Sequence, residues 1–391
     1  MTPGARTQAA IELLDEVIRA AAEGGAAADT LIGRYFAARR YAGSKDRRAV
    51  RELVYRAVRR CGERPASGRA AMLAVAGEDA EVAATFDGSP HGPAPIRADE
   101  RVAEAGLAPA WLLELLRASG LSDGELPALV DRAPLDLRVN RLRADPADIA
   151  ARLEGAAAIA GLPDALRLPA GTDVAPLAGR VEVQDAGSQA ATLTTLAKPG
   201  ERVVDLCAGG GGKTLALAAM MTNEGAILAC DTDRGRLQRL APRAGRAGVA
   251  VVETRLLNPN RELEMLSEWH GAADCVLVDA PCSGTGTWRR NPEARWRLTP
   301  ARLERLVATQ AHLLTVAAKL VRPGGALVHV VCSLLDVEGR DQVATFLAVH
   351  PGWTAERPRI GFGRPHGLGL RLTPAHDGTD GFFVARLKRP C

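Results

Sequence analysis

The stretch VVDLCAGGGGKT, residues 203–214, decides the predicted fold of this 391-residue chain. It begins as a short apolar run suited to a buried strand, passes through four consecutive glycines, Gly209 to Gly212, and continues as a helix-forming run. A strand, a glycine turn and a helix in this order form a nucleotide-type pocket at the carboxyl end of the strand. Glycine lets the backbone approach a ligand closely and adopt positive φ angles. The alternative is a glycine turn with a structural role alone.

The spacing of these glycines separates the loop from two common phosphate-binding motifs. It does not fit the G-x-G-x-x-G fingerprint of dinucleotide-binding folds, and the Walker pattern would require a glycine at Cys207. We therefore expect a ligand without a phosphate chain.

From residue 181 onward, apolar runs of strand length alternate with helical segments. The expected strands are 202–206, 226–231, 249–253, 274–279 and 326–332, and the expected helices are 234–240, 261–269 and 301–320. Two further strands, 368–373 and 381–387, flank a turn sequence and form a hairpin. This alternation predicts an α/β domain with a doubly wound, mainly parallel sheet, Rossmann-like in architecture.

The first 80 residues carry helical periodicity and many cations. Apolar residues recur at helical spacing over 7–25 and again over 30–61. Ten cations lie in the second block, namely Arg34, Arg39, Arg40, Lys45, Arg47, Arg48, Arg51, Arg56, Arg59 and Arg60. They form either a solvated helical face or a surface that neutralises RNA phosphates, which releases counterions.

Composition shifts mark the expected domain limits. Residues 78–100 are rich in Pro, Gly, Ala and Asp and lack periodicity, as a linker does. A half-buried strand at 135–139 and a helix that starts at Pro146 behind the acidic cap Asp145 indicate a small α+β module. The expected limits are a helical domain at 1–80, a linker at 81–100, the module at 101–180 and the catalytic domain at 181–391.

Bulk properties exclude several classes of protein. No apolar run reaches the length of a membrane span, and the first ten residues lack the apolar core of a signal peptide, so we expect a cytoplasmic protein. The seven cysteines show no C-x-x-C pair, which favours reduced thiols over disulfides or a metal site. A net charge of +4 and a pI of about 8.8 allow a polyanionic partner. A monomer is the default expectation.

An acid at the end of the second strand of the Rossmann-like domain, Asp231, is placed to accept hydrogen bonds from ribose hydroxyls. The alternative is that Asp231 caps the next helix, with Asp233 close behind. Because no phosphate-holding signature follows, the expected ligand is a nucleoside derivative. S-adenosylmethionine is an adenosine with an amino-acid tail and no phosphate, and it fits this description.

Two cysteines follow neighbouring strands of the predicted sheet. The strand 274–279 runs into Asp279-Ala280-Pro281-Cys282, and the strand 326–332 ends at Cys332. Parallel strands deliver their carboxyl ends to one crevice, so both thiols and the carboxylate could face the same substrate. A thiolate added to carbon 6 of cytosine makes carbon 5 nucleophilic enough to accept a methyl group, which is nucleophilic covalent catalysis. One thiol would add, and the other would assist release.

These motifs resemble the RsmB/Sun family of RNA cytosine-5 methyltransferases over nearly the whole length of the chain. The matching segments are VQDAGSQAA (183–191), DLCAGGGGKT (205–214), DAPCSGTGTWRRNPEARWR (279–297), VCSLLDVEG (331–339) and DGTDGFFVARL (377–387). Residues 135–143, LDLRVNRLR, resemble that family's small module, and the basic start resembles the NusB-like RNA-binding domain of its ribosomal branch.

The resemblance implies a role for each residue of the predicted site. Cys332 would be the nucleophile and Cys282 the thiol that helps to release the product. Asp279 would hold the cytosine edge, with Lys213 near the donor and the base. S-adenosylmethionine would lie against Cys207, Ala208, Gly209, Gly210, Gly211 and Gly212, with contacts to Lys213, Asp231, Asn258 and Asp279.

Two positions depart from the family pattern. The usual loop is close to CAAPGGKT, and here Gly209 and Gly210 replace alanine and proline. An aspartate usually follows the third strand to bind the adenine amino group, and Asn258 occupies the corresponding place. Trp288 and Trp296, which lie among arginines, are expected either to stack on unpaired RNA or to pack in the protein.

The sequence thus predicts methylation of carbon 5 of a cytidine in RNA, with small-subunit (16S) ribosomal RNA as the expected substrate because of the NusB-like start. Transfer RNA is the competing substrate. DNA methylation is disfavoured, because the DNA enzymes carry their nucleophile at the position of Cys282 and have no need of Cys332. A non-catalytic RNA-binding assembly factor is the alternative from a different class, and it would not bind the donor.

Overall fold

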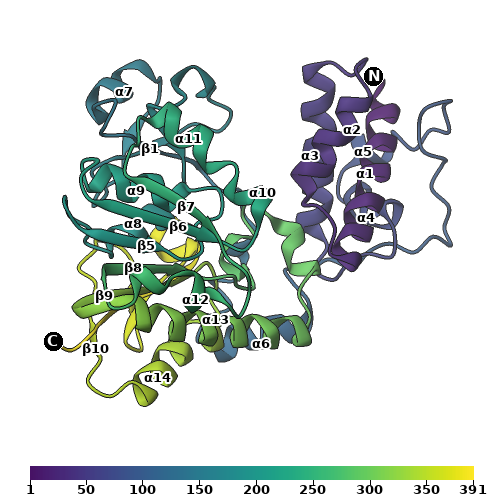
Figure 1. Ribbon diagram of the computed structural model, residues 1–391. Helices are drawn as coiled ribbons and strands as arrows, with labels where there is room; N and C mark the ends of the chain where they lie inside the picture. Colours follow the sequence, from purple (N-terminus) through teal and green to yellow (C-terminus); the bar gives the residue numbers. More distant parts are fainter. The chain divides into compact units, whose positions relative to one another are not determined.

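The computed structural model describes residues 1–391 and divides into two compact units. The first unit comprises Met1–Arg132 and Thr287–Thr299, and the second comprises Ala133–Gly286 and Pro300–Cys391. In Figure 1 the helices of the first unit are purple to blue, and the sheet of the second unit runs from teal to yellow. None of the helices is both long and apolar enough to cross a membrane.

The first unit is built from helices. They are α1 (Pro3–Glu23), α2 (Ala28–Ala38), α3 (Ser44–Arg60), α4 (Gly68–Ala76), α5 (Ala80–Ala83) and α6 (Ala110–Ala118). The apolar faces of α1 to α4 share one core, which includes Leu13, Val17, Val54 and Met72. The block expected at 30–61 is two helices, because the chain turns at Arg39–Gly43, where Ala42 N donates to Arg39 O (3.1 Å).

The segment Thr287–Thr299 follows the Cys282 loop in sequence but folds with these helices. Trp296 is 4% exposed within the helical core, and its Nε1 donates to Cys61 O at the end of α3 (3.1 Å). Arg295 is fully buried and donates from Nη2 to the same carbonyl (2.9 Å). Arg295 and Trp296 thus donate to a carbonyl at the C-terminus of α3 that has no helical partner, and the charge of Arg295 is favourable at this end of a helix. Glu293 accepts from Ala28 N at the start of α2 (3.0 Å).

This packing decides the role of the two tryptophans. Trp288 is 1% exposed and Trp296 is 4% exposed, so neither ring has a free face. The prediction that they stack on unpaired RNA is therefore wrong, and the alternative, packing within the protein, is confirmed. The arginines around them had suggested a basic surface, but the guanidinium of Arg295 is used to hold α3.

Residues 81–100, expected to be a linker, begin within α5 and then run as a loop along α4. Arg69 of α4 donates from Nη2 to Glu100 Oε1 (2.8 Å) and to the carbonyls of Ala94 (3.1 Å) and Pro95 (3.2 Å). The loop is thus held to the helices by one guanidinium. The domain limits expected from the sequence stay a prediction.

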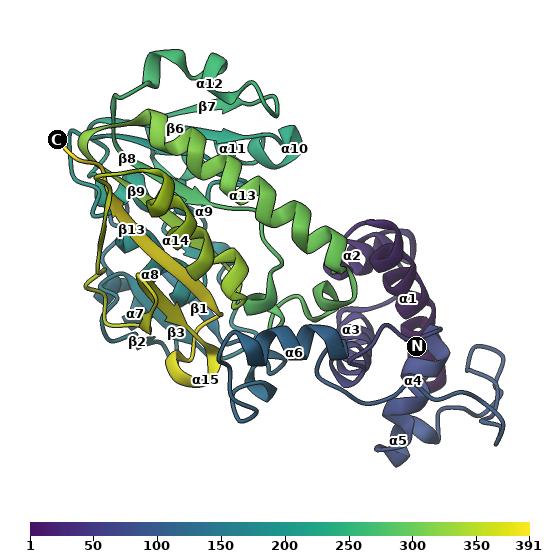
Figure 2. The same ribbon diagram turned by 90° about the horizontal axis from the view of Figure 1, so that it is seen from below.

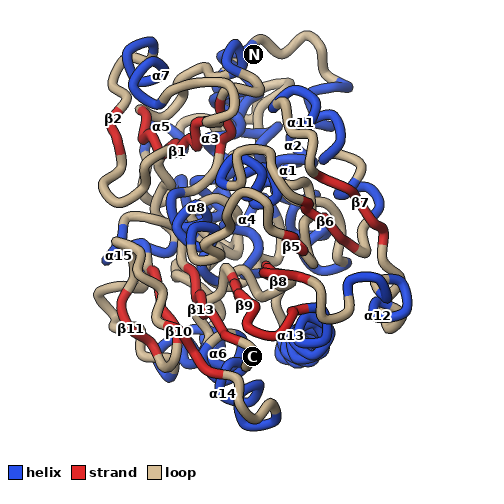
Figure 3. Tube along the Cα trace, turned by 60° about the vertical axis from the view of Figure 1, so that its left-hand side comes forward, coloured by secondary structure: helices blue, strands red, loops and turns tan.

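The second unit contains a nine-stranded mixed sheet. Its strands are β5 (Arg202–Asp205), β6 (Ala226–Asp231), β7 (Val252–Leu256), β8 (Ala273–Asp279), β9 (Val321–Val331), β10 (Thr354–Glu356), β11 (Arg364–His366), β12 (Gly369–Leu372) and β13 (Phe382–Lys388). The order is β11-β12-β13-β9-β8-β5-β6-β7, and β10 also pairs with β13. The five neighbouring strands β9, β8, β5, β6 and β7 run parallel to one another, whereas β13 runs antiparallel to β9. Figure 3 shows the strands of this sheet in red.

Helices cover both faces of this sheet. They are α8 (Ala186–Leu193), α9 (Gly212–Met220), α10 (Arg234–Leu237), α11 (Leu240–Ala247), α12 (Glu262–Met265), α13 (Pro300–Leu320), α14 (Arg340–Val349) and α15 (Pro374–Asp377). Because successive strand residues point to opposite faces, Val204 packs with α13 and α14, and Val203 packs with α8 and α9. In Figure 2, α13 and α14 lie across the near face of the strands. The predicted doubly wound α/β architecture is confirmed.

Several elements differ from their expected bounds. The helix expected at 261–269 is α12 followed by a 3-10 turn at Ser267–Trp269, and the strand expected at 326–332 is β9, which begins at Val321. The strand expected at 249–253 lies at Val252–Leu256, because Val249 is still tied to the end of α11: it follows the C-cap Gly248, and its amide donates to Ala244 O (2.9 Å). The helix expected at 234–240 is two short helices, α10 and α11, separated at Gln238–Arg239.

A separate antiparallel sheet precedes the large one in the second unit. Its order is β2 (Ala157–Ala158), β3 (Ala165–Leu168), β1 (Leu135–Val139) and β4 (Val181–Val183). Leu137 and Leu166 pack with Ile149 of α7 (Pro146–Arg152) in a small core of its own. Asp145 accepts from Ala147 N (2.9 Å), which confirms the acidic cap expected for this helix.

Replacing Trp296 by alanine tests whether the 287–299 segment supports the helical core. We expect Trp296→Ala to lower the free energy of unfolding by about 3 kcal/mol, because it empties a buried site and removes the bond to Cys61 O. Urea denaturation would measure this. Tyr41→Ala, at a residue 74% exposed, is the matched control and should change stability by less than about 0.5 kcal/mol. Equal stabilities of the two variants would show that the segment does not support the core.

Candidate active site

The loop after β5, residues 207–212, is hereafter the donor loop, and it is fixed to the neighbouring strand β6. Ala208 N donates to Cys230 O (2.7 Å), and Gly209 N donates to Asp231 Oδ2 (2.7 Å). Gly211 is the N-cap of α9 and has a φ of 85°. A Cβ at Gly211 would lie 2.1 Å from Leu240 Cδ1, so both conformation and space require glycine there. The backbone therefore forms a close-fitting turn at the start of α9.

Asp231 ends β6 and organises the backbone around it. Besides Gly209 N, it accepts Asp233 N at Oδ1 (2.8 Å). The helix-capping role considered for Asp231 belongs to Asp233, whose Oδ1 accepts Arg236 N (2.9 Å). Each oxygen of Asp231 keeps a second lone pair, so the carboxylate can still accept from ribose hydroxyls. Asn258 is exposed and follows Leu257, whose amide donates to Asp231 O (2.9 Å), so it lies just beyond the same strand ends.

Lys213 and Asp279 form an ion pair at the carboxyl ends of β5 and β8. Lys213 Nζ lies 2.7 Å from Asp279 Oδ2, and the two side chains are 10% and 30% exposed. Burial acts to lower the pKa of Lys213, but the charges of Asp279 and Cys332 outweigh it and raise this pKa above its ordinary value. Lys213 therefore stays a cation beside Cys332.

Asp205 lies at the end of β5 and is a neighbour of this pair. Burial raises the pKa of Asp205 to about 7, although Thr214 Oγ1 donates to its Oδ2 (2.7 Å). Near neutral pH this carboxyl is partly protonated. The ammonium group of Lys213 therefore pairs with Asp279, at the mouth of the site, and not with Asp205.

The two cysteines predicted to act together are in contact. Cys282 Sγ lies 3.3 Å from Cys332 Sγ. The hydrogen bond to Cys332, followed by burial, holds the pKa of Cys282 well above its ordinary value. Cys282 is therefore protonated near neutral pH. A proton held on Cys282 is compatible with the nucleophilic role predicted for Cys332, which stays a prediction.

Glu338, not singled out from the sequence, holds the two cysteine loops together. Its buried carboxylate accepts Ser283 N (2.8 Å) beside Cys282, and it also accepts the hydroxyls of Ser283 and Ser333, the latter beside Cys332. Gln310 Nε2 of α13 donates to Glu338 Oε1 (3.0 Å). No cation pairs with this acid. The sequence feature that could have pointed to Glu338 is an acidic residue within the apolar stretch that follows Cys332.

Other cysteines differ from these two. Cys61 and Cys275 are buried, and burial raises the pKa of their thiols to about 11 and about 12. Burial likewise raises the pKa of Cys230 and Cys207. These thiols are unreactive near neutral pH. Cys282 and Cys332 are set apart by their contact with each other at the strand ends.

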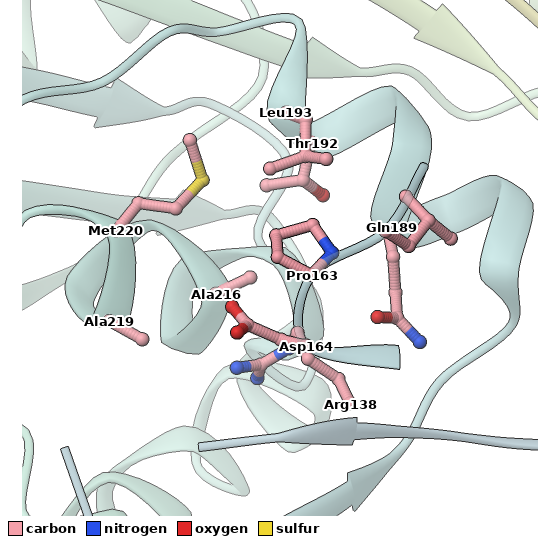
Figure 4. Close-up of a pocket in the computed structure, with 10 residues that line it drawn as sticks. Arg138, Pro163, Asp164, Gln189, Thr192, Leu193, Ala216, Ala219 and Met220 are labelled. Carbon is pink, nitrogen blue, oxygen red and sulfur yellow. The ribbon is translucent and has the colours of Figure 1, made fainter. Parts of the chain in front are cut away.

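A small cavity elsewhere in the second unit does not compete with this site. Figure 4 shows it between Arg138 of β1, residues 189–193 of α8, and Ala216, Ala219 and Met220 of α9. Its volume is about 20 Å³, enough for about one water molecule. Arg138 Nη2 has no protein partner, and one water would satisfy it.

The donor loop fits S-adenosylmethionine on two observations. Added Cβ atoms at Gly209 and Gly211 would collide with Arg236 and Leu240, so the loop is a bare backbone cradle. Both oxygens of Asp231 sit beside that cradle and keep lone pairs for hydroxyl donors. The residues that would hold the donor are thus the loop, Asp231 and the Lys213–Asp279 pair.

A Rossmann-like sheet with a glycine cradle and paired thiols at its carboxyl edge defines the class as a methyltransferase dependent on S-adenosylmethionine. The family model "16S rRNA methyltransferase RsmB/F" matches residues 192–388, half of the chain. The chain belongs to the RsmB/F family.

Curated relatives agree with this assignment. A probable ribosomal RNA small subunit methyltransferase B from Synechocystis sp. is 36% identical over 305 residues, which cover 72% of this chain and 66% of that protein. The ribosomal RNA small subunit methyltransferase B of Xylella fastidiosa (strain 9a5c) is 37% identical over 290 residues, which cover 71% of this chain and 68% of that protein. The match thus spans about two thirds of the length of these relatives.

Solved structures share the fold. The structure of PH0851 aligns with a TM-score of 0.78 at 24% identity and covers 100% of this chain and 99% of its own. NSun6 from Pyrococcus horikoshii, solved with SFG, aligns with a TM-score of 0.65 at 20% identity, over 72% of this chain and 98% of its own. These likenesses confirm the Rossmann-like methyltransferase fold.

Replacing Glu338 by glutamine tests its hold on the cysteine loops. Glu338→Gln turns one acceptor into a donor that faces hydroxyls, so we expect unfolding to become easier by about 1–3 kcal/mol. The loosened loops should also let iodoacetamide alkylate Cys282 and Cys332 faster, as read by mass spectrometry. Asp341→Asn, at a half-exposed acid in α14, is the control. Wild-type stability and alkylation rates in Glu338→Gln would rule out this role.

Proposed function

We propose that the protein methylates carbon 5 of a cytidine in 16S ribosomal RNA, with S-adenosylmethionine as the methyl donor. The observation that carries this proposal is the 3.3 Å contact between Cys282 and Cys332, beside the Lys213–Asp279 pair. A single nucleophilic thiol needs no second cysteine. Two thiols in contact suit a reaction in which one adds to the base and the other takes part in its release.

In the proposed reaction Cys332 attacks as a thiolate, supported by the charge of Lys213. Its sulfur bonds to carbon 6 of the cytosine, and the carbon 5–carbon 6 double bond shifts its electrons toward carbon 5. Asp279 holds the polar edge of the base as this charge develops. The bound donor supplies an electrophilic methyl group. Carbon 5, now bearing the methyl group, loses its proton to a base, and the carbon 6–sulfur bond breaks while Cys282 assists release.

The helical unit is proposed to contact the RNA. Several expected cations are used within the protein, since Arg51 pairs with Asp29 (2.8 Å) and Arg60 pairs with Glu78 (2.8 Å). Five remain exposed without an ion pair, namely Arg34, Arg40, Lys45, Arg47 and Arg48. They lie around the turn between α2 and α3, where Tyr41 is 74% exposed. Cations beside an exposed aromatic ring suit an RNA strand.

The remaining parts of the proposal follow from the substrate. The protein would act in the cytoplasm, where ribosomal RNA matures in a bacterium, and as a monomer that holds one RNA. The family description and the names of the relatives support ribosomal RNA over transfer RNA.

A covalent trap tests the reaction. The protein and S-adenosylmethionine would be incubated with 16S ribosomal RNA transcribed with 5-fluorocytidine, because fluorine at carbon 5 blocks the last elimination. We expect a denaturation-resistant protein–RNA adduct with the wild type and its loss in Cys332→Ala. In the Cys282→Ala variant, Cys332 should still attack the cytosine. Because release of the RNA from Cys332 is then impaired, we expect the adduct to persist on unmodified RNA as well.

Each alternative gives a different result. Loss of the adduct in Cys282→Ala alone would reverse the roles of the two thiols. An adduct on transfer RNA transcripts but not on 16S RNA would contradict the ribosomal substrate. No adduct, together with no binding of S-adenosylhomocysteine by calorimetry, would favour a non-catalytic assembly factor.

A further inference from the structure

One side chain from outside the donor loop holds the carbonyl of Gly210. Arg243 of α11 donates from Nη1 to Gly210 O and from Nη2 to Glu182 Oε2 of β4 (2.6 Å). Ala208, Gly209 and Gly211 are held by backbone or Asp231 contacts, whereas Gly210 has no other hydrogen bond. Arg243 thus fixes the part of the loop that nothing else fixes.

The bridge is well placed to keep its geometry. The Arg243 side chain is 26% exposed and that of Glu182 is 17% exposed, so this pair is largely withdrawn from water. Charge-assisted hydrogen bonds are stronger and more directional than neutral ones. Because Arg243 bonds both the Glu182 carboxylate and the Gly210 carbonyl, it restricts the position of the loop more than an isolated surface ion pair would.

The helix that carries Arg243 is itself anchored at both ends. Leu240, three residues earlier on the same face, packs against Gly211. At the other end, Asn140 Nδ2 donates to Ala247 O (2.8 Å) and to Gly179 O (2.9 Å). The guanidinium therefore acts from a fixed support between the small antiparallel sheet and the donor loop.

Gly210 makes such a support necessary. Two successive glycines, Gly209 and Gly210, give the loop more freedom to lose than any other pair of residues would. A Cβ at Gly210 would lie 3.3 Å from Arg243 Nη1, a tight contact that would shift the guanidinium by a few tenths of an ångström. Glycine at 210 and arginine at 243 are therefore complementary.

We propose that Arg243, held by Glu182, is a positioning residue for the methyl donor: it orders the Gly209–Gly210 turn before the donor binds. The proposal rests on the donor site of the proposed function. Arg243 acts through the loop backbone and has no part in the reaction with the base.

Binding of S-adenosylhomocysteine, measured by isothermal titration calorimetry, tests the proposal. We expect Arg243→Ala to weaken binding about tenfold, because part of the binding free energy must then be used to order the loop. In the protein without donor, amide hydrogens at 209–213 should exchange faster. Arg246→Ala, at an exposed arginine of the same helix, is the matched control and should bind as the wild type does.

Two further variants separate loop ordering from a general loss of structure. Glu182→Gln should weaken binding in the wild-type background and have little further effect in Arg243→Ala. Gly210→Ala, added to Arg243→Ala, should recover about two- to fivefold in affinity, because alanine stiffens the turn where the guanidinium no longer occupies the space.

The outcomes distinguish this inference from the proposed function. If the wild type and Arg246→Ala bind S-adenosylhomocysteine and Arg243→Ala binds equally well, Arg243 does not position the donor. If Arg243→Ala binds more weakly but loop exchange is unchanged and Gly210→Ala rescues nothing, the effect does not pass through the loop. Failure of the wild type to bind would instead overturn the donor site itself.

Discussion

The contact between the thiols of Cys282 and Cys332 depends on one buried carboxylate. Glu338 has no cation partner, so its charge is satisfied by hydrogen bonds from the two loops that carry the cysteines. Burial lowers the pKa of His329 to about 4, so this ring is neutral, and it lies 3.0 Å from the carbonyl of Glu338. Removing any one donor would leave part of a buried charge unsatisfied, which is costly. The arrangement thereby resists the separation of the two sulfurs.

Charge at the mouth of the site is arranged around this contact. Lys213 is the cation within the cluster, and its partner Asp279 is the more exposed of the two. A cytosine edge that reaches Asp279 would therefore meet a carboxylate already oriented by the lysine. The pKa of Cys282 is held well above its ordinary value by its contact with Cys332 and by burial, and Lys213 stays a cation beside this pair. In the proposed reaction the same few residues would orient the base and support the nucleophile.

Much of the catalytic architecture could be predicted because it is local in sequence. The strand at 226–231, the helix over 301–320 and the cap Asp145 follow from periodicity and short-range hydrogen bonds. The meeting of Cys282 and Cys332 followed from the rule that parallel strands end at one edge. The roles of Glu338 and Arg243 were not predicted, because they depend on hydrogen bonds to Ser283 N and Gly210 O, which lie 55 and 33 residues away in sequence.

The fate of Trp296 shows why domain limits are harder to predict than elements. In sequence the segment 287–299 belongs to the motif that begins at Asp279, and its arginines and tryptophans suggested an RNA-contacting loop. In the structure it completes the helical unit, where it supplies donors to the last carbonyls of α3 and an acceptor to the first amide of α2. The helical core of residues 1–132 is consequently incomplete without a segment encoded more than 150 residues later. The chain passes from the second unit to the first directly after the Cys282 loop, between Gly286 and Thr287, so a domain limit lies inside a continuous sequence motif.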